Sequence, residues 1–199
     1  MRIQRIIQIA AVFGALSISA AEAHTGAGST AGFGHGFVHP FSGLDHILAM
    51  VAVGLVAAHL GERALWLVPC SFIVMMAAGG VLGASGVELP LVEVGIAMSV
   101  IVLGGLVAFQ ASLPTGVAMG LVGFFAIFHG HAHGAEMPVD ASGVSYAGGF
   151  IVATAILHAV GVAIGLRWGG LSSGASRRVA QFGGGAMALA GVGILSGYL

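Results

Sequence analysis

Six apolar stretches of near-spanning length dominate the amino-acid sequence and constrain it more than any other feature. They lie at about 43–60, 64–84, 92–111, 114–133, 146–167 and 177–198. A helix needs about 20 apolar residues to cross the hydrocarbon core of a bilayer. Charged residues make up only 7% of the chain, against about 25% in an ordinary soluble domain, so they could not cover a water-exposed surface. We therefore expect an all-α integral membrane protein with six transmembrane helices, and neither a soluble nor a disordered chain.

Residues 1–23 have the pattern of a secretory signal peptide. Arg2 and Arg5 precede an apolar run that extends from Ile6 to Ile18, and Ala21-Glu22-Ala23 matches an A-x-A cleavage site. Cleavage would leave residues 24–199 as a single six-helix transmembrane domain. An uncleaved signal anchor is the alternative, and in both cases residue 24 emerges on the outer side of the membrane.

The charges between the apolar stretches follow the positive-inside pattern. With residue 24 outside, three short connections face the cytoplasm, and four arginines lie at or beside them: Arg63, Arg167, Arg177 and Arg178. The outer connections, near 85–91 and 134–145, contain no arginine and carry Glu88, Glu136 and Asp140. The pattern predicts a multi-pass protein of a bacterial inner membrane, with both mature termini in the periplasm.

Glycines spaced four residues apart predict where the helices approach one another. Without a hydrophobic drive between helices in lipid, small residues at i and i+4 allow close backbone packing. Such pairs occur in four of the predicted helices: Gly79/Gly83, Gly116/Gly120, Gly161/Gly165 and Gly193/Gly197. We expect these pairs to form the contacts of a tight helical bundle.

Composition also excludes several classes of function. The net charge of −1 and the absence of a basic cluster argue against a nucleic-acid partner. The chain has no lysine, which excludes a Walker-type phosphate loop. Its single cysteine, Cys70, excludes an intrachain disulfide and a CxxC metal site. The expected surroundings are the lipid bilayer, and the sequence is compatible with a homo-oligomer.

Two histidine clusters remain to be explained in so apolar a chain. The first, His39-Pro40-Phe41-Ser42-Gly43-Leu44-Asp45-His46, leads into the first predicted helix. The second extends from Phe128 to Glu136 and ends the fourth helix. Because the first helix starts outside and the fourth ends outside, both clusters are expected at the outer membrane face. One site can therefore contain residues from both.

The second cluster has the spacing of a metal site on a helix. His129 and His133 are four residues apart and Glu136 is three further on, so all three share one helix face, whereas His131 points elsewhere. Imidazole and carboxylate ligands together suit Ni, Co, Zn or Cu(II) better than Mg or Ca. We therefore expect a divalent transition-metal site here.

Other polar residues have two interpretations. Ser42 and Asp45 are spaced as a capping box, which could account for Asp45 alone. Glu93, at the start of the third helix, is either favoured there by the helix dipole or part of a functional site at membrane depth. His158, deep in the fifth helix, is either a relay on a conduction path or hydrogen-bonded to a neighbouring helix.

The two motifs resemble those of the HupE/UreJ family of membrane proteins. The resemblance rests on His39-Pro40-x-x-Gly43-x-Asp45-His46 and on Phe128-His129-Gly130-x-Ala132-His133-Gly134-x-Glu136, and with the signal and six helices it covers nearly the whole chain. It implies a nickel or cobalt permease accessory to nickel enzymes such as hydrogenase and urease. It also implies a metal site whose residues are His39, Asp45, His46, His133 and Glu136, with Glu93 involved.

Our hypothesis is a permease for uptake of Ni²⁺ or Co²⁺ into the cytoplasm, with His129 added to that ligand set from its helix face. We expect no catalytic residue and no organic cofactor. Two alternatives remain. A membrane-embedded metallohydrolase could use the same cluster for zinc, although the chain has no H-E-x-x-H motif. A metal-binding sensor would bind the ion without transporting it.

Overall fold

Every regular element in the described part of the chain is a helix. The computed structural model describes residues 29–137, 143–169 and 173–199, so the signal peptide expected at residues 1–23 lies outside the described residues. The helices are α2 (Ser29–Val38), the 3-10 helix η1 (His39–Phe41), α3 (Leu44–Leu60), α4 (Ala64–Ala84), α5 (Val92–Phe109), α6 (Thr115–Ala135), α7 (Gly143–Gly169) and α8 (Ser173–Leu195).

Five of these helices, α4 to α8, are long and apolar enough to cross a membrane. The sixth predicted span corresponds to α3, which has 17 residues. Residues 32–41 precede it at an angle of 79°, and together with α3 they form a sixth candidate span. The expected all-α, multi-pass architecture is therefore confirmed. The spans predicted from the sequence begin at residue 43, so α2 is an addition to them.

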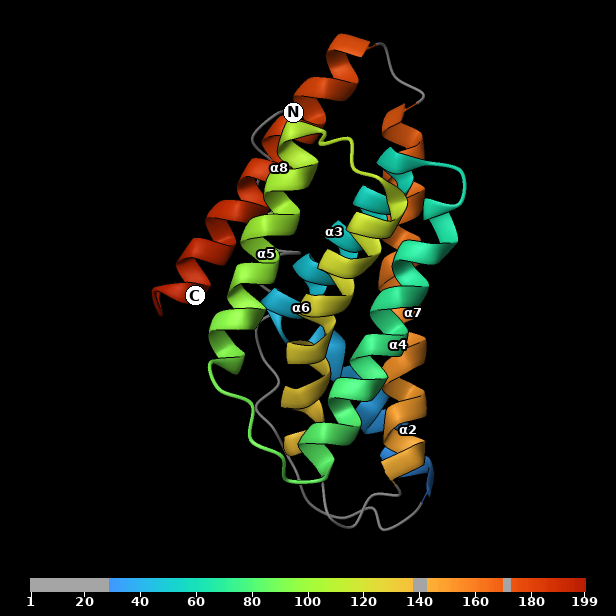
Figure 1. The fold of residues 1–199 in the computed structure, drawn as a ribbon, viewed down its shortest axis with the longest axis vertical. Helices are drawn as coiled ribbons and strands as arrows, with labels where there is room; N and C mark the ends of the chain where they lie inside the picture. Colours follow the sequence, from blue (N-terminus) through green and yellow to red (C-terminus); the bar gives the residue numbers. More distant parts are fainter. Residues whose placement is uncertain (1–28, 138–142, 170–172) are drawn as a thin grey trace, which may run out of the picture.

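The spanning helices alternate in direction, and this alternation sorts their connections between two ends (Figure 1). The turns between α3 and α4 and between α5 and α6 lie at the upper end in the figure, as do the last turn of α7 and the first turn of α8. The lower end holds η1, the first turns of α3 and α5, and the last turn of α6. Arg63 and Arg167 belong to helix ends at the upper end, while both histidine motifs come together at the lower one.

Close glycine contacts join α4 to α6 and α3 to α7. A Cβ added at Gly79 or Gly83 would collide with the backbone of Ile127 or His131 on α6. One at Gly161 would collide with the backbone of Val51 on α3. The predicted packing roles of Gly79/Gly83 and Gly161/Gly165 are therefore confirmed.

The other two predicted glycine pairs are wrong. A Cβ added at Gly116 or Gly120 would meet no atom within 4 Å, so these two glycines lie on a side of α6 that packs against no other described helix. Gly193 lies against Leu199 at the end of the chain, and Gly197 follows the end of α8 with a positive φ of 75°. Spacing alone did not distinguish these glycines from the ones at helix contacts.

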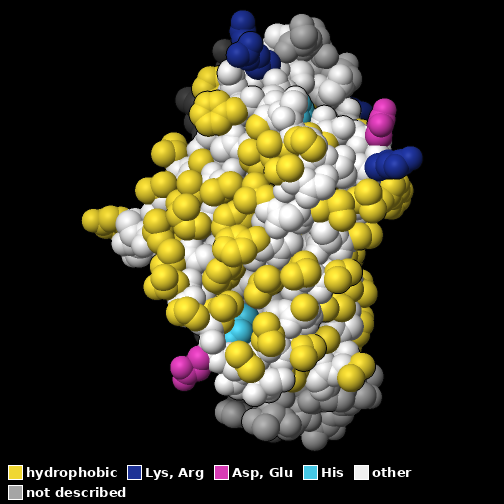
Figure 2. Space-filling model, viewed as in Figure 1, with side chains coloured by type: hydrophobic (Ala, Val, Ile, Leu, Met, Phe, Trp, Pro, Cys, Tyr) yellow, Lys and Arg dark blue, Asp and Glu magenta, His cyan; other side chains and the backbone are white. Residues whose placement is uncertain are grey.

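Many large apolar side chains lie on the outer surface of the bundle. Trp66, Phe109 and Phe182 are each at least 76% exposed, and apolar side chains cover the middle of the face shown in Figure 2. In water such a surface would be a liability, but lipid tails are an appropriate solvent for it. The buried core, with Met50, Phe72 and Leu103 fully enclosed, lies between α3, α4, α5, α6 and α7.

Candidate metal centre

A sharp corner in the chain places the first histidine motif at the lower end of the bundle. Pro40 is buried at the start of η1, where its missing N–H removes no helical hydrogen bond. Gly43 is extended and precedes the first turn of α3. The hydroxyl of Ser42 lies 3.4 Å from the carbonyl of Val38, and no side chain caps α3. The capping-box interpretation of Ser42 and Asp45 is therefore wrong.

Asp45 instead contacts the imidazole of its neighbour His46. A carboxylate oxygen of Asp45 lies 2.9 Å from Nδ1 of His46. Because a carboxylate only accepts hydrogen bonds, Nδ1 carries the proton and Nε2 keeps its lone pair. Metal-binding histidines are commonly held this way by a carboxylate that fixes the tautomer and the ring orientation. The structure thus gives Asp45 an orienting role toward His46.

His46 and His133 direct their Nε2 atoms at the same point from two helices. The two nitrogens lie 2.5 Å apart, although His46 and His133 are 87 positions apart in the sequence. Both side chains are buried. Because Nε2 of His46 carries the lone pair, it accepts this hydrogen bond from Nε2–H of His133. An ion that took the place of that proton would be held between one nitrogen from α3 and one from the last turns of α6. The structure therefore brings the two sequence motifs together, as expected.

His39 and Glu136 complete a group around His133. One ligand atom from each of the three residues lies within 4.8 Å of the others, and Nε2 of His39 is 4.0 Å from a carboxylate oxygen of Glu136. Two ligands of one ion at about 2.1 Å can be at most about 4.2 Å apart. A shift of several tenths of an ångström would therefore bring all three atoms into one coordination sphere.

A cavity of about 250 Å³ opens beside these residues, and we call it the outer cavity. It is lined by His39, Ser42, Gly43, Asp45, His46, Glu93, Ile96, Ala132, His133 and Glu136. Glu93 thus joins the other predicted ligands from the first turn of α5. Three carboxylates and no arginine belong to this lining, so its electrostatic potential favours a cation.

His129 lies one helical turn deeper than His133, with its ring centre 4.8 Å from that of His46. Its Nε2 is 2.9 Å from the hydroxyl of Ser99 on α5. That hydroxyl has one proton and donates it to the carbonyl of Ile96, at 2.6 Å. It must therefore accept from His129, which leaves the lone pair on the buried, unpartnered Nδ1 of His129.

Ser99 is a residue that sequence reasoning missed. The signal for it was present, since Ser99 is the only hydroxyl-bearing residue of α5 and, apart from Glu93, its only polar side chain. His131, by contrast, lies apart from the other histidines as expected. Its Nε2 donates to the carbonyl of Val87 at 2.7 Å and so ties the end of α6 to the connection between α4 and α5.

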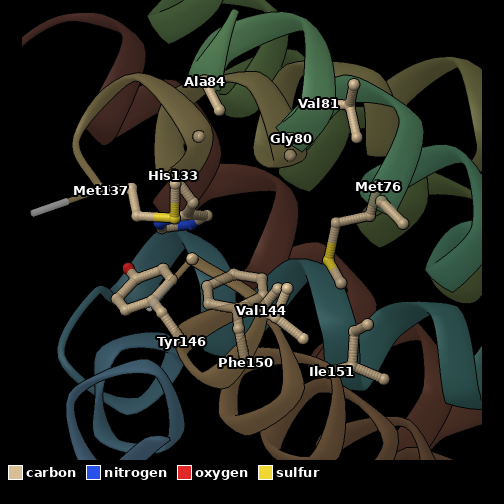
Figure 3. Close-up of a pocket in the computed structure, with 15 residues that line it drawn as sticks. Met76, Gly80, Val81, Ala84, His133, Met137, Val144, Tyr146, Phe150 and Ile151 are labelled. Atoms are coloured by element: carbon tan, nitrogen blue, oxygen red, sulfur yellow. The ribbon is translucent and has the colours of Figure 1, made fainter. Parts of the chain in front are cut away.

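A second cavity, of about 380 Å³, is also lined by His133. Figure 3 shows His133, Met137 and Tyr146 at one end of it and Met76 and Ile151 at the other. Its walls come from α4, α6 and α7 and are almost entirely apolar. His133 therefore lines both a polar cavity that can hold a hydrated cation and an apolar cavity that cannot.

Comparison with known proteins agrees with the sequence motifs. The model of the HupE / UreJ protein family matches residues 11–194. "Protein HupE" of Rhizobium leguminosarum bv. viciae is 50% identical over 183 residues, which cover 90% of this chain and 92% of that protein. No solved structure matches the chain.

Proposed function

The chain belongs to the HupE/UreJ family, and on that premise we propose that it is a membrane permease that admits Ni²⁺, or Co²⁺, into the cytoplasm. The observation that carries the proposal is the group formed by His39, His133 and Glu136 beside Nε2 of His46. This group lies at one end of a multi-pass helical bundle, where an ion would enter.

The chemistry of the donor set supports a borderline transition metal. Neutral imidazoles bind Ni, Co, Zn and Cu well, whereas Mg and Ca prefer a shell of oxygens. Intrinsic affinity at such a site favours Cu²⁺ over Ni²⁺, so selectivity has to come from geometry and from metal availability. The outer cavity has room for an ion that still holds part of its water shell.

Orientation follows from the charges at the two ends. The end with Arg63, Arg167, Arg177 and Arg178 is assigned to the cytoplasm by the positive-inside rule. The outer cavity then opens to the periplasm. In a Cys70→Ser background, a membrane-impermeant thiol reagent should label Glu88→Cys in intact spheroplasts. It should label Arg63→Cys only after lysis, and the reverse result would invert the proposed direction of entry.

The energy for uptake is available without nucleotide hydrolysis. An inside-negative potential contributes about 2.3 kcal/mol per charge per 100 mV, which is about 4.6 kcal/mol for a divalent ion. Trapping of the ion by cytoplasmic proteins would add to this drive. Uptake driven by the membrane potential does not require coupling to protons.

Reconstituted proteoliposomes test the function. The wild-type protein should carry radiolabelled Ni²⁺ into the lumen when a potential, inside negative, is imposed, and a chelator inside should increase the accumulation. A sensor would bind the ion at the membrane without filling the lumen. A zinc hydrolase would instead turn over a lipid or peptide in a chelator-sensitive manner. Either of these last two outcomes, without luminal nickel, would overturn the proposal.

A further inference from the structure

His158 is a buried histidine that the outer cavity does not include. It lies on α7, about 18 Å along the helix from Tyr146 at 1.5 Å per residue, and only 2% of it is exposed. Neither of its ring nitrogens has a hydrogen-bond partner in the described part of the chain. The sequence-based alternative, a hydrogen bond to a neighbouring helix, is therefore wrong.

The lack of a hydrogen-bond partner for the buried imidazole of His158 requires an explanation. A buried polar atom without a partner is destabilising, and folded proteins leave few such atoms. The edge-to-face contact with the ring of Phe72, at 5.0 Å between centres, would suit a phenylalanine equally well. Ionisable residues that face the interior of a transmembrane bundle commonly mark the path of an ion.

A column of ring contacts leads from the outer cavity to His158. The ring centres of His133 and His46 are 4.4 Å apart, and those of His46 and His129 are 4.8 Å apart. The ring of Phe72 then lies 5.7 Å from His129 and 5.0 Å from His158. His129 has its lone pair on an unpartnered Nδ1, so both histidines beside Phe72 offer free nitrogen.

Two further groups that can bind a metal lie on the helix faces beside His158. Thr154 precedes it by one turn of α7, and the Thr154 hydroxyl donates to the sulfur of Met76 on α4 at 3.7 Å. Met76 in turn follows Phe72 by one turn of α4. A thioether, a hydroxyl and an imidazole therefore come from the helix faces that meet here. Imidazole and thioether select transition metals over Mg²⁺ and Ca²⁺.

We propose that His158 forms an inner binding station for the divalent transition metal, which reaches it from His129 across the ring of Phe72. This proposal rests on the proposed function, because an inner station matters only if the ion passes beyond the outer cavity. A single imidazole with a sulfur nearby holds an ion less firmly than the outer cluster. Weaker binding at His158 fits an intermediate site on a transport path, because an ion that is transported must also be released from it.

The test uses Co²⁺ as the probe on the purified full-length protein and on proteoliposomes. The wild type should bind two Co²⁺ ions of unequal affinity, and the visible Co²⁺ spectrum should change again as the second ion binds. In His158→Phe the second ion and its spectral change should be lost, with the affinity of the first ion kept within about twofold. Uptake should fall about tenfold or more, the scale reached when a metal site loses supporting groups.

Stability separates this role from a structural one. Because His158 makes no hydrogen bond, His158→Phe should unfold at the same temperature as the wild type or higher. His158→Leu serves if the larger ring disrupts packing. Normal uptake, or a second Co²⁺ ion still bound, in a folded variant would overturn the inner station. His131→Gln is the matched control, and it should keep both ions and normal uptake.

The two proposals fail in different ways. If the wild type binds two ions but never fills the lumen, the permease function is wrong, and the binding count alone then decides the inner station. If the wild type transports while only one ion binds and His158→Phe transports equally well, the inner station is wrong and the permease stands.

Discussion

Nδ1 of His46 lies 2.9 Å from the carboxylate of Asp45, and Nε2 of the same ring faces Nε2 of His133. Asp45 therefore determines which nitrogen of His46 is free. The first motif therefore contains the ligand His46 together with Asp45, the carboxylate that orients its ring. The family resemblance names Asp45 among the metal-site residues, and the structure suggests how it acts there.

Removing the orienting carboxylate should weaken metal binding without emptying the site. Asp45→Ala frees the His46 ring to rotate and to change tautomer, and we expect the affinity for Co²⁺ to fall about 10- to 100-fold. Asp45→Asn keeps an oxygen that can accept from Nδ1, so it should recover part of this loss. Isothermal titration with Co²⁺ measures both variants. Equal losses in the two variants would favour direct coordination by Asp45.

Substitution of His133 or Glu136 should abolish or strongly reduce nickel uptake. His133→Ala removes the residue that contacts His46 and also belongs to the group with His39 and Glu136. Glu136→Gln removes the charge beside His39. We expect nickel uptake to drop to background in His133→Ala and to decrease strongly in Glu136→Gln. Radiolabelled Ni²⁺ uptake in cells that lack other nickel systems, normalised to protein level, measures this. His131→Gln is the control on the same helix, and intact uptake in both site variants would refute the site.

The hydroxyl of Ser99 should stabilise the buried His129. Ser99→Ala leaves the Nε2–H of His129 without an acceptor, and an unmade buried hydrogen bond costs about 1–3 kcal/mol. Ser71→Ala is a milder control, because that hydroxyl donates to the carbonyl of Val68 on its own helix, lies 3.4 Å from the carbonyl of Met119 on α6, and contacts no histidine. Denaturant unfolding in detergent compares the two. A Ser99 variant as stable as the Ser71 variant would contradict the assigned tautomer.

Packing of α4 on α6 should depend on one glycine and not on another. A Cβ at Gly130 would collide with the backbone of Met76, whereas one at Gly120 would meet nothing within 4 Å. Gly130→Ala should therefore force the helices apart, lower stability and reduce uptake. Gly120→Ala should be neutral or slightly stabilising, by up to about 1 kcal/mol from helix propensity. Folded yield and uptake of this pair provide the measurement, and similar behaviour of the two would contradict the close contact between α4 and α6.

Helix positions could be predicted from the sequence, because length and apolarity alone identify a membrane span. The predicted stretch at 64–84 coincides with α4, and the other spans differ by a few residues. The helix α2 was missed because it has only ten residues, too few to span, and three of them are glycine.

Helix contacts were harder to predict, for a physical reason. In lipid a helix is apolar on every side, so hydrophobic periodicity does not reveal which face is buried. Gly79 and Gly120 are equivalent in sequence terms, yet one faces α6 and the other has no neighbour within 4 Å. The site was predictable to the extent that its members are ionisable. The roles of Ser99 and of the Asp45 contact depend on atoms that only the folded chain brings together.

The separation of 87 positions between His46 and His133 in the sequence affects how long a bound ion could stay. An ion bound by both residues would act as a reversible cross-link that closes a loop of this length. A permanent cross-link closing a loop of about 100 residues is worth about 4.7 kcal/mol. An ion that linked the two helices with a comparable free energy would make the bundle rigid and would dissociate slowly. If the protein is the permease proposed above, it therefore has to bind the ion weakly enough that the contact between α3 and α6 through the ion can break each time an ion passes.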